Sequence, residues 1–181
     1  MSKNTAFQSE GNGDAKYLDR HSLQCPSGYV INYMKLERSV WQAKIRYKYK
    51  CCRSQLSCSN TRKTNQKTTN GNGNSVYLDR QTIQCDNNGI NYLKLDSDGG
   101  FFWPKWNYKY DCCSVSNAKS SVSCYYKNTG FNQDGGGHVG YLERHTLQCN
   151  SDREFITYLK LNRNKQQTMI RYDYKCCGIK Q

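Results

Sequence analysis

Residues 17–25 read YLDRHSLQC, and this nine-residue block recurs as YLDRQTIQC at 77–85 and as YLERHTLQC at 141–149. A second block follows each copy: NYMKL at 32–36, NYLKL at 91–95 and TYLKL at 157–161. A third block closes each unit: IRYKYKCC at 45–52, WNYKYDCC at 106–113 and IRYDYKCC at 170–177. Three blocks that recur three times in the same order predict three copies of one unit of about 60 residues.

Every block has the composition of a β-strand. Tyrosine, isoleucine, leucine and threonine dominate the blocks, and turn formers such as CPSG, CDNNG and DSDGG separate them. Alternation with a period of two puts Tyr47 and Tyr49 on one face of a strand, and Lys48 and Lys50 on the other. Because no segment shows a helical period, the sequence predicts strands throughout, the block at 17–25 included.

Three or four short strands do not form a stable sheet alone, so the units are expected to pack around a shared core. The predicted fold class is all-β with pseudo-threefold symmetry: a three-sheet β-prism, or alternatively a trefoil-like barrel. We expect one closed domain over residues 1–181, divided into repeats at 14–70, 71–134 and 135–181. The KNTAF stretch at 3–7 resembles KNTGF at 127–131, so residues 1–13 are expected to complete the third repeat.

Composition restricts the class of protein. Apolar residues make up 36% of the 181 positions, which is below the usual share of 45–50% or so and predicts a modest core. No run approaches the roughly 18 apolar residues that a membrane-spanning helix needs. The formal net charge of +13 predicts attraction to anionic partners: nucleic acid, sulfated glycan, an anionic membrane surface or an acidic matrix protein.

Eleven cysteines follow a repeated pattern of one lone cysteine, an adjacent pair and, in two units, a further cysteine. There is no CxxC motif, and adjacent cysteines cannot easily both bind one tetrahedral zinc ion. We therefore expect disulfides, no metal site, and a secreted, extracellular location. Strand parity predicts five pairs: Cys25–Cys51, Cys52–Cys58, Cys85–Cys112, Cys113–Cys124 and Cys149–Cys176. Cys177 is left unpaired by this scheme and is available for self-association through an intermolecular disulfide.

A family resemblance starts at Cys25. The run CPSGYVI at 25–31, the strand ending in IRYKYKCC and the following RSQLSC at 53–58 resemble the repeat of dermatopontin-like proteins. CPSGYVINYMKLE at 25–37 is similar to the repeat of vitelline membrane outer layer protein I, a threefold β-prism. The resemblance covers about half of each unit; the YLDR block has no counterpart in it. It implies an extracellular matrix or coat protein that binds glycans, proteoglycans or cells, with no catalytic residues.

An aromatic, an acid and an arginine recur at the start of each unit. A tyrosine beside an Asp–Arg pair suits both the apolar face and the hydroxyls of a sugar, so these sets are candidate glycan-binding sites. The alternative is that each acid and arginine form an ion pair that orients its strand. The residues concerned are Tyr17, Asp19, Arg20, Tyr77, Asp79, Arg80, Tyr141, Glu143 and Arg144.

A second candidate surface consists of cations that alternate with tyrosines and is expected to bind polyanions such as sulfated polysaccharide. The alternative is a solvated outer face that prevents edge-to-edge aggregation. The residues are Arg46, Lys48, Lys50, Arg62, Lys63 and Lys109. Nucleic-acid proteins use the same ingredients, but no nucleic-acid motif is present and the cysteines indicate the wrong compartment, so no specific nucleic-acid partner is expected.

Catalytic signals are weak. His21 and His145 occupy the same repeat position, where the second unit has Gln81, as expected of a tolerated residue rather than a catalytic one. No nucleophile elbow, phosphate-binding loop or HExxH motif occurs, and paired carboxylates for glycoside hydrolysis are a minor alternative. The sequence therefore predicts a non-enzymatic, cofactor-free, multivalent lectin-like protein; the alternative is a structural or adhesive coat protein without a ligand pocket.

Overall fold

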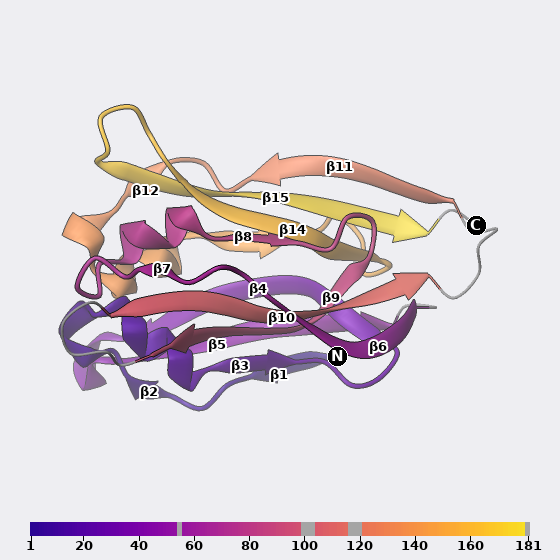
Figure 1. Cartoon of the computed structure of the whole chain (residues 1–181), viewed down its shortest axis with the longest axis horizontal. Coiled ribbons are helices and arrows are strands. Elements are labelled where there is room, and N and C mark those ends of the chain that lie inside the picture. Colours follow the sequence, from indigo (N-terminus) through magenta and orange to yellow (C-terminus); the bar gives the residue numbers. More distant parts are fainter. Residues whose placement is uncertain (54–55, 99–103, 116–120, 180–181) are drawn as a thin grey trace.

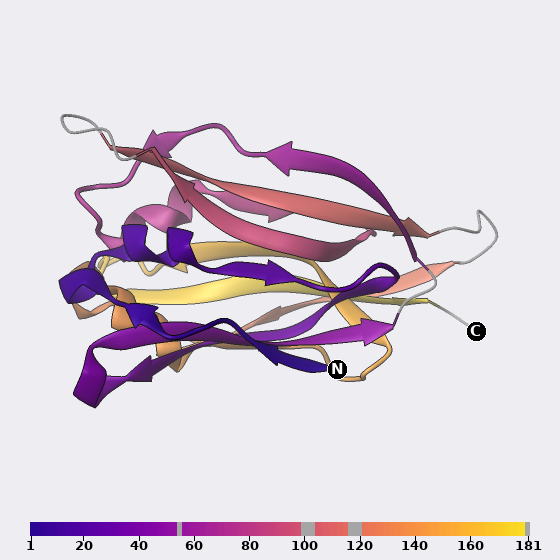
Figure 2. The same cartoon turned by 90° about the horizontal axis from the view of Figure 1, so that it is seen from below.

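The computed structural model describes residues 1–53, 56–98, 104–115 and 121–179. Within these ranges the chain is mostly β-structure, arranged as three antiparallel sheets of five strands each (Figures 1 and 2). The same strand order recurs in each sheet: an edge strand, the two long strands of a hairpin, and a short strand at the other edge. The described strands do not close into a barrel, which argues against the trefoil-like alternative.

The strands of each sheet come from different parts of the chain. Sheet A contains β1 (Ser2–Asn4), β2 (Gln8–Ser9), β4 (Tyr29–Ser39), β5 (Lys44–Arg53) and β13 (Thr146–Gln148). Sheet B contains β3 (Ser22–Gln24), β6 (Leu56–Thr64), β7 (Thr68–Thr69), β9 (Gly89–Ser97) and β10 (Lys105–Val115). Sheet C contains β8 (Thr82–Gln84), β11 (Val122–Asn128), β12 (Asn132–Gln133), β14 (Glu154–Arg163) and β15 (Met169–Ile179).

In each sheet the short edge strand next to the long hairpin comes from a different unit of the sequence than the hairpin itself. Strand β3 pairs with β9, β8 pairs with β14, and β13 pairs with β4. The exchange runs from the first unit to the second, from the second to the third, and from the third back to the first. Because every sheet depends on a strand from elsewhere in the chain, the units cannot be independent beads.

The prediction of strands across the YLDR blocks is wrong for the first part of each block. These residues form short 3₁₀ helices, and only the last three residues before each lone cysteine are extended. The helices of the three blocks are η2 (Ala15–Arg20), η4 (Ser75–Arg80) and η6 (Val139–Arg144). Three shorter helices lie outside the blocks: η1 (Gly11–Gly13), η3 (Val40–Gln42) and η5 (Gly135–Gly137). The physical reason is capping: Asp14, Asn74 and His138 each accept a backbone hydrogen bond at the start of the helix that follows.

The amino-terminal segment lies in sheet A. Strand β1 pairs with β5, with Lys3 opposite Tyr49, and β2 pairs with the start of β5. The sequence predicted that residues 1–13 complete the third repeat. In sheet A, β1 occupies the place beside the long strand that β6, from the end of the first repeat, occupies in sheet B and that β11, from the end of the second, occupies in sheet C.

Three of the five predicted disulfides are confirmed, and each of them joins two sheets. Each lone cysteine follows a short edge strand in one sheet, and its partner lies near the end of a long strand in another. The three bonds are Cys25–Cys51, Cys85–Cys112 and Cys149–Cys176. Together they link sheet B to A, sheet C to B and sheet A to C. Such bonds stabilise the fold mainly by restricting the unfolded chain, and they indicate an oxidising environment.

The other two predicted pairs, Cys52–Cys58 and Cys113–Cys124, are wrong, and so is the prediction that Cys177 is unpaired. The bonds formed are Cys58–Cys113 and Cys124–Cys177, and the free cysteine is Cys52. The prediction assumed that each second cysteine of a pair bonds to the next cysteine along the chain. Instead the chain crosses to the next sheet, where β6 places Cys58 directly opposite Cys113. The site predicted at Cys177 for an intermolecular disulfide is therefore absent.

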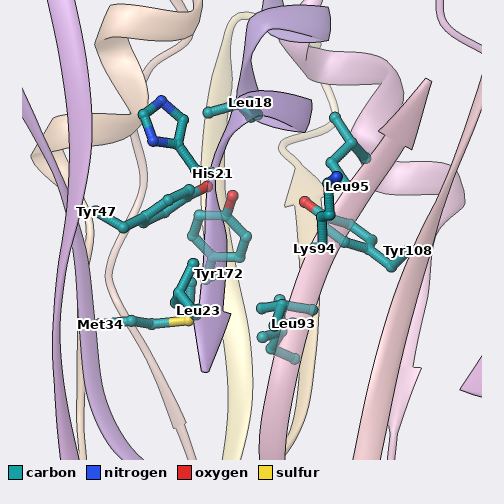
Figure 3. Close-up of a pocket in the computed structure, with 11 residues that line it drawn as sticks. Leu18, His21, Leu23, Met34, Tyr47, Leu93, Lys94, Leu95, Tyr108 and Tyr172 are labelled. Carbon is teal, nitrogen blue, oxygen red and sulfur yellow. The ribbon is translucent and has the colours of Figure 1, made fainter. Parts of the chain in front are cut away.

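The core lies where the three sheets face one another. Each sheet contributes one tyrosine from the same position of its long strand: Tyr47, Tyr108 and Tyr172. Burial raises the pKa of all three phenols. Figure 3 shows these rings and His21 around a cavity of about 10 Å³, which is space for about one water molecule. The centre of the molecule is thus packed, and a ligand site must lie on the surface.

Candidate functional site

The two ends of the molecule differ in how they are held together. At one end lie the adjacent cysteine pairs, near the carboxyl ends of β5, β10 and β15, on the right of Figure 1. At the other end lie the 3₁₀ helices and three glycine turns, defined as residues 11–13, 71–73 and 135–137. We call this second end the glycine-turn end. It has no disulfide among the described residues, so other contacts must maintain it.

All nine residues of the glycine turns have positive φ. The angles are 57°, 57° and 92° in the first turn, 58°, 56° and 83° in the second, and 60°, 67° and 88° in the third. Residues with a side chain rarely adopt this left-handed region, and asparagine is among those that tolerate it best. This explains why the sequences are GNG, GNG and GGG.

The turns interlock around the end of the molecule. A side chain at Gly13 would collide with His138, one at Gly73 with Asp14, and one at Gly137 with Asn74. Each of these contacts joins one glycine turn to the residue that follows another. The backbone supports the same arrangement, because the N–H of Ala15 donates a 2.7 Å hydrogen bond to the carbonyl of Gly73.

A solvent-open basin of about 450 Å³ lies between the three turns, within the size range of small-ligand sites. Its lining is backbone and neutral polar groups, with one charged side chain, Asp14, whose carboxylate lies 3.0 Å from the ammonium of Lys16. The side chains of Asn12 and Asn72 are exposed at the basin, and the third turn has Gly136 at the same position. Two of the three turns therefore present an exposed side-chain amide at their centre, and the third presents none. Amides donate and accept hydrogen bonds, which suits an uncharged ligand with hydroxyl groups.

The side chains that cap the helices also line the basin. Asp14 accepts from the N–H of Lys16 at 2.8 Å, Asn74 from Val76 at 3.0 Å, and His138 through Nδ1 from Gly140 at 3.0 Å. Acceptance at Nδ1 places the proton of a neutral His138 ring on Nε2. These three capping side chains are thus fixed in orientation before any ligand arrives.

The predicted Tyr–Asp–Arg sets lie beside the glycine turns but do not line the basin. One face of each tyrosine ring covers the first glycine of its turn, because a side chain at Gly11, Gly71 or Gly135 would collide with that ring. The arginine of each set stacks on the same tyrosine. The guanidinium–ring distances are 4.1 Å for Arg20–Tyr17, 4.3 Å for Arg80–Tyr77 and 4.3 Å for Arg144–Tyr141. These contacts leave the guanidinium groups, rather than the ring faces, as the exposed part of each set.

The acids of the three sets have different partners. Asp79 forms an ion pair with Arg163 of sheet C at 2.7 Å. Asp19 lies against sheet B, where the position of Arg163 is occupied by Ser97, and burial raises the pKa of its carboxyl group. Glu143 lies near Arg38, which forms a two-bond ion pair with the buried Glu10 at 2.5 and 2.6 Å. Asp79 thus pairs with an arginine of the neighbouring sheet, whereas the equivalent arginine near Glu143, Arg38, pairs with Glu10.

Trp41 is the most exposed large apolar side chain among the described residues, at 100%. It lies in η3, at the tip of the β4–β5 hairpin. The tip is tied to the first glycine turn, because the N–H of Glu10 donates to the carbonyl of Ala43 at 2.9 Å. An exposed indole therefore stands at the same end of the molecule as the basin.

The predicted polyanion-binding residues divide between two sheets. Arg46, Lys48 and Lys50 point outward from β5, and Lys109 points outward from β10 and pairs with Asp96 at 2.9 Å. Lys63 is exposed on β6. The side chain of Arg62 lies outside the described residues.

No group of three or more metal-ligating side chains occurs among the described residues, and none of their helices is long and apolar enough to span a membrane. His21 and His145 are buried to 1% exposure, and burial lowers the pKa of each imidazole to about 4. Nδ1 of each ring lies within hydrogen-bond distance of a threonine hydroxyl, Thr5 at 2.9 Å for His21 and Thr129 at 2.7 Å for His145.

Comparison with known protein families, curated proteins and solved structures found no match. The site therefore has to be interpreted from its own geometry. The basin residues Asn12 and Asn72 were not among the predicted site residues. The glycine-rich stretches before the three blocks, GNG, GNG and GGG, are visible in the sequence, but only the folded chain brings the three turns to one place.

Proposed function

We propose that this protein is a secreted, non-enzymatic glycan-binding protein, and that its three sheets are the faces of a pseudo-threefold β-prism. The observation that supports the proposal most directly is the polar basin at the glycine-turn end. It is open to solvent, has one charged side chain in its lining, and is surrounded by backbone and amide groups, of which the Asn74 amide is held by its capping hydrogen bond. Groups of this kind match the hydroxyls of a neutral sugar, and preorganised groups lose little entropy on binding.

The proposed contacts are made by a few named groups. Asn12 and Asn72 would each donate and accept hydrogen bonds through the side-chain amide, and Nε2 of His138 would donate one. Trp41 would stack on the apolar face of a sugar further along the same glycan. Arg20, Arg80 and Arg144, at equivalent positions of the three units, would contact acidic substituents around the site.

A glycan array at two salt concentrations tests the proposal, with the N12G/N72G variant beside the wild type. The substitution is matched to the fold, because the third turn already has glycine at this position. We expect the wild type to bind a defined neutral glycan in a salt-resistant manner, and the variant to lose at least tenfold in affinity with unchanged thermal stability. Equal binding by both proteins would overturn the assignment of the basin.

The alternative function is a structural or adhesive coat protein without a specific ligand. The disulfides that join the three sheets and the fully exposed Trp41 favour it. A rigid protein with an exposed apolar side chain can adhere to other molecules without a ligand pocket. Absence of binding to every glycan on the array at both salt concentrations, together with self-association that the W41S variant abolishes, would support this alternative.

A further inference from the structure

The three sheets allow a position-by-position comparison of their outer faces. Outward residues of the long strands β5 and β15 alternate with buried ones, whereas in β10 Asn107 and Asp111 at the equivalent positions are buried. In sheet A the outward row is Lys44, Arg46, Lys48 and Lys50. At the same positions sheet B has Lys105, Asn107, Lys109 and Asp111, and sheet C has Met169, Arg171, Asp173 and Lys175. Only sheet A has a cation at every position of the row.

The neighbouring hairpin strand adds to the difference from sheet C but not to that from sheet B, where Lys94 lies opposite Lys109. In sheet A, β4 contributes Lys35, directly opposite Lys48, and one carboxylate, Glu37. Like charges placed directly opposite each other across a sheet are destabilising. In sheet C the residue opposite Lys160 is Asp173, so the same position there is neutral.

The single carboxylate of this face does not neutralise it. Glu37 accepts from Arg46 at 2.8 Å and lies 3.8 Å from the ammonium of Lys48. Among the described residues, no carboxylate lies within ion-pair distance of Lys35, Lys44 or Lys50. Sheet B differs in that its Lys109 has its own partner, Asp96, at 2.9 Å.

The spacing of the row suits a linear anion. Alternate residues of a strand lie about 7 Å apart, so the four cations of β5 span about 20 Å along one line. Lys48 retains 45% exposure of its side chain, and sheet A forms one outer side of the molecule (Figure 2). A small anion would not need such a row, whereas an extended polymer with regularly spaced charges can contact all four cations.

From these observations we propose that the outer face of sheet A binds a linear sulfated polysaccharide along β5. The five disulfides indicate an oxidising environment, where sulfated glycans rather than nucleic acids are the expected polyanions. This surface is separate from the basin, since none of the β5 row lines it. Failure of one proposal therefore leaves the other standing.

The test uses substitutions that the fold already contains. The R46N/K48D/K50D variant introduces the residues found at the same positions of the sister sheets, Asn107, Asp173 and Asp111. The K160D/R171N/K175D variant changes the net charge by the same amount on sheet C and serves as the control. Heparin binding is measured by isothermal titration calorimetry at several NaCl concentrations, and circular dichroism confirms that each variant is folded.

We expect the sheet A variant to lose at least tenfold in heparin affinity at 0.15 M NaCl. The slope of log affinity against log salt is expected to fall by about three, roughly one for each cation removed. The sheet C variant is expected to stay within about threefold of the wild type. Equal losses in both variants would mean that net charge alone attracts heparin, and unchanged binding in both would exclude the face; either result overturns the proposal. Tighter binding to single-stranded DNA of equal charge than to heparin would also overturn it.

Discussion

Cys177 lies directly opposite Cys124 across the β11–β15 pair and is bonded to it. Cys52 occupies the same position in sheet A, and its thiol is the only one free among the described residues. The register of β1 on β5 places Ser2 opposite Lys50, so the position opposite Cys52 is the one immediately before Met1. Burial raises the pKa of the Cys52 thiol to about 11, and the sulfur donates to the carbonyl of Glu154 at 3.2 Å.

A cysteine placed one residue before Met1 is expected to form a disulfide with Cys52. An amino-terminal Met-Cys extension would close a loop of about 50 residues, which corresponds to about 4 kcal/mol in the chain-entropy account. Thiol titration under denaturing conditions and the free energy of unfolding in urea check the result. A Met-Ser extension is the control, and a thiol at Cys52 that still titrates in the Met-Cys protein would contradict the predicted register.

Acid should destabilise the protein through its two buried histidines. Each folded-state pKa of about 4 lies below the ordinary value near 6.5, so the unfolded chain takes up protons first. The contribution of the two histidines to the free energy of unfolding is expected to be constant above about pH 6.5. It should decrease as the pH falls toward 4, by on the order of 3 kcal/mol per histidine. Urea denaturation at a series of pH values measures the effect.

The matched variant for this prediction is H21Q/H145Q, because the second unit has Gln81 at the same buried position. Gln81 donates from its amide to the hydroxyl of Thr68 at 2.7 Å and does not titrate. The variant is expected to lose most of the pH dependence between 6.5 and 4. A pH profile identical to that of the wild type would show that other groups control acid stability.

The glycine turns should tolerate substitution only at their centre. The G73A variant places a methyl group against Asp14 at a φ of +83°, so the free energy of unfolding is expected to fall by about 2 kcal/mol or more. The G136N variant is the control, because nothing lies within 4 Å of the added atom and asparagine occurs at this position in the other two turns. Equal effects of the two substitutions would contradict the interlocked arrangement.

An arginine at position 97 is expected to form an ion pair with Asp19. The S97R variant reproduces the relation of Arg163 to Asp79 and should lower the pKa of Asp19, which burial now raises. NMR titration of the Asp19 carboxyl group measures the shift directly. The gain in stability at pH 7 should be about 0.5–1 kcal/mol, and an unchanged Asp19 pKa would contradict the equivalence of the two positions.

Local patterning predicted part of the fold well. Period-two alternation correctly identified Tyr47 and Tyr49 as buried and their lysine neighbours as outward-facing, because side-chain direction in a strand depends only on residue parity. The same parity argument found the three inter-sheet disulfides. It failed for the YLDR blocks, where helix capping by Asp14 and its counterparts outweighs a strand-like composition.

The remaining features depend on which strands meet, and parity contains no information on that. The bonding of Cys58 to Cys113 follows from β6 crossing to sheet B, and the sequence separation of 55 residues gave no local signal for it. The basin has the same origin, since Asn12 and Asn72 belong to turns that are distant along the chain.

The sequence by itself determined the β-class and the inward and outward faces of the long strands, it predicted three repeated units, and its cysteines indicated an oxidising environment. These properties follow from local periodicity, composition and cysteine count. The tertiary structure alone decided the exchange of short strands between sheets, the partner of every second cysteine, the free thiol at Cys52 and the convergence of the glycine turns. These follow from long-range pairing, whose register is set by the packing of three sheets around one core rather than by any single segment.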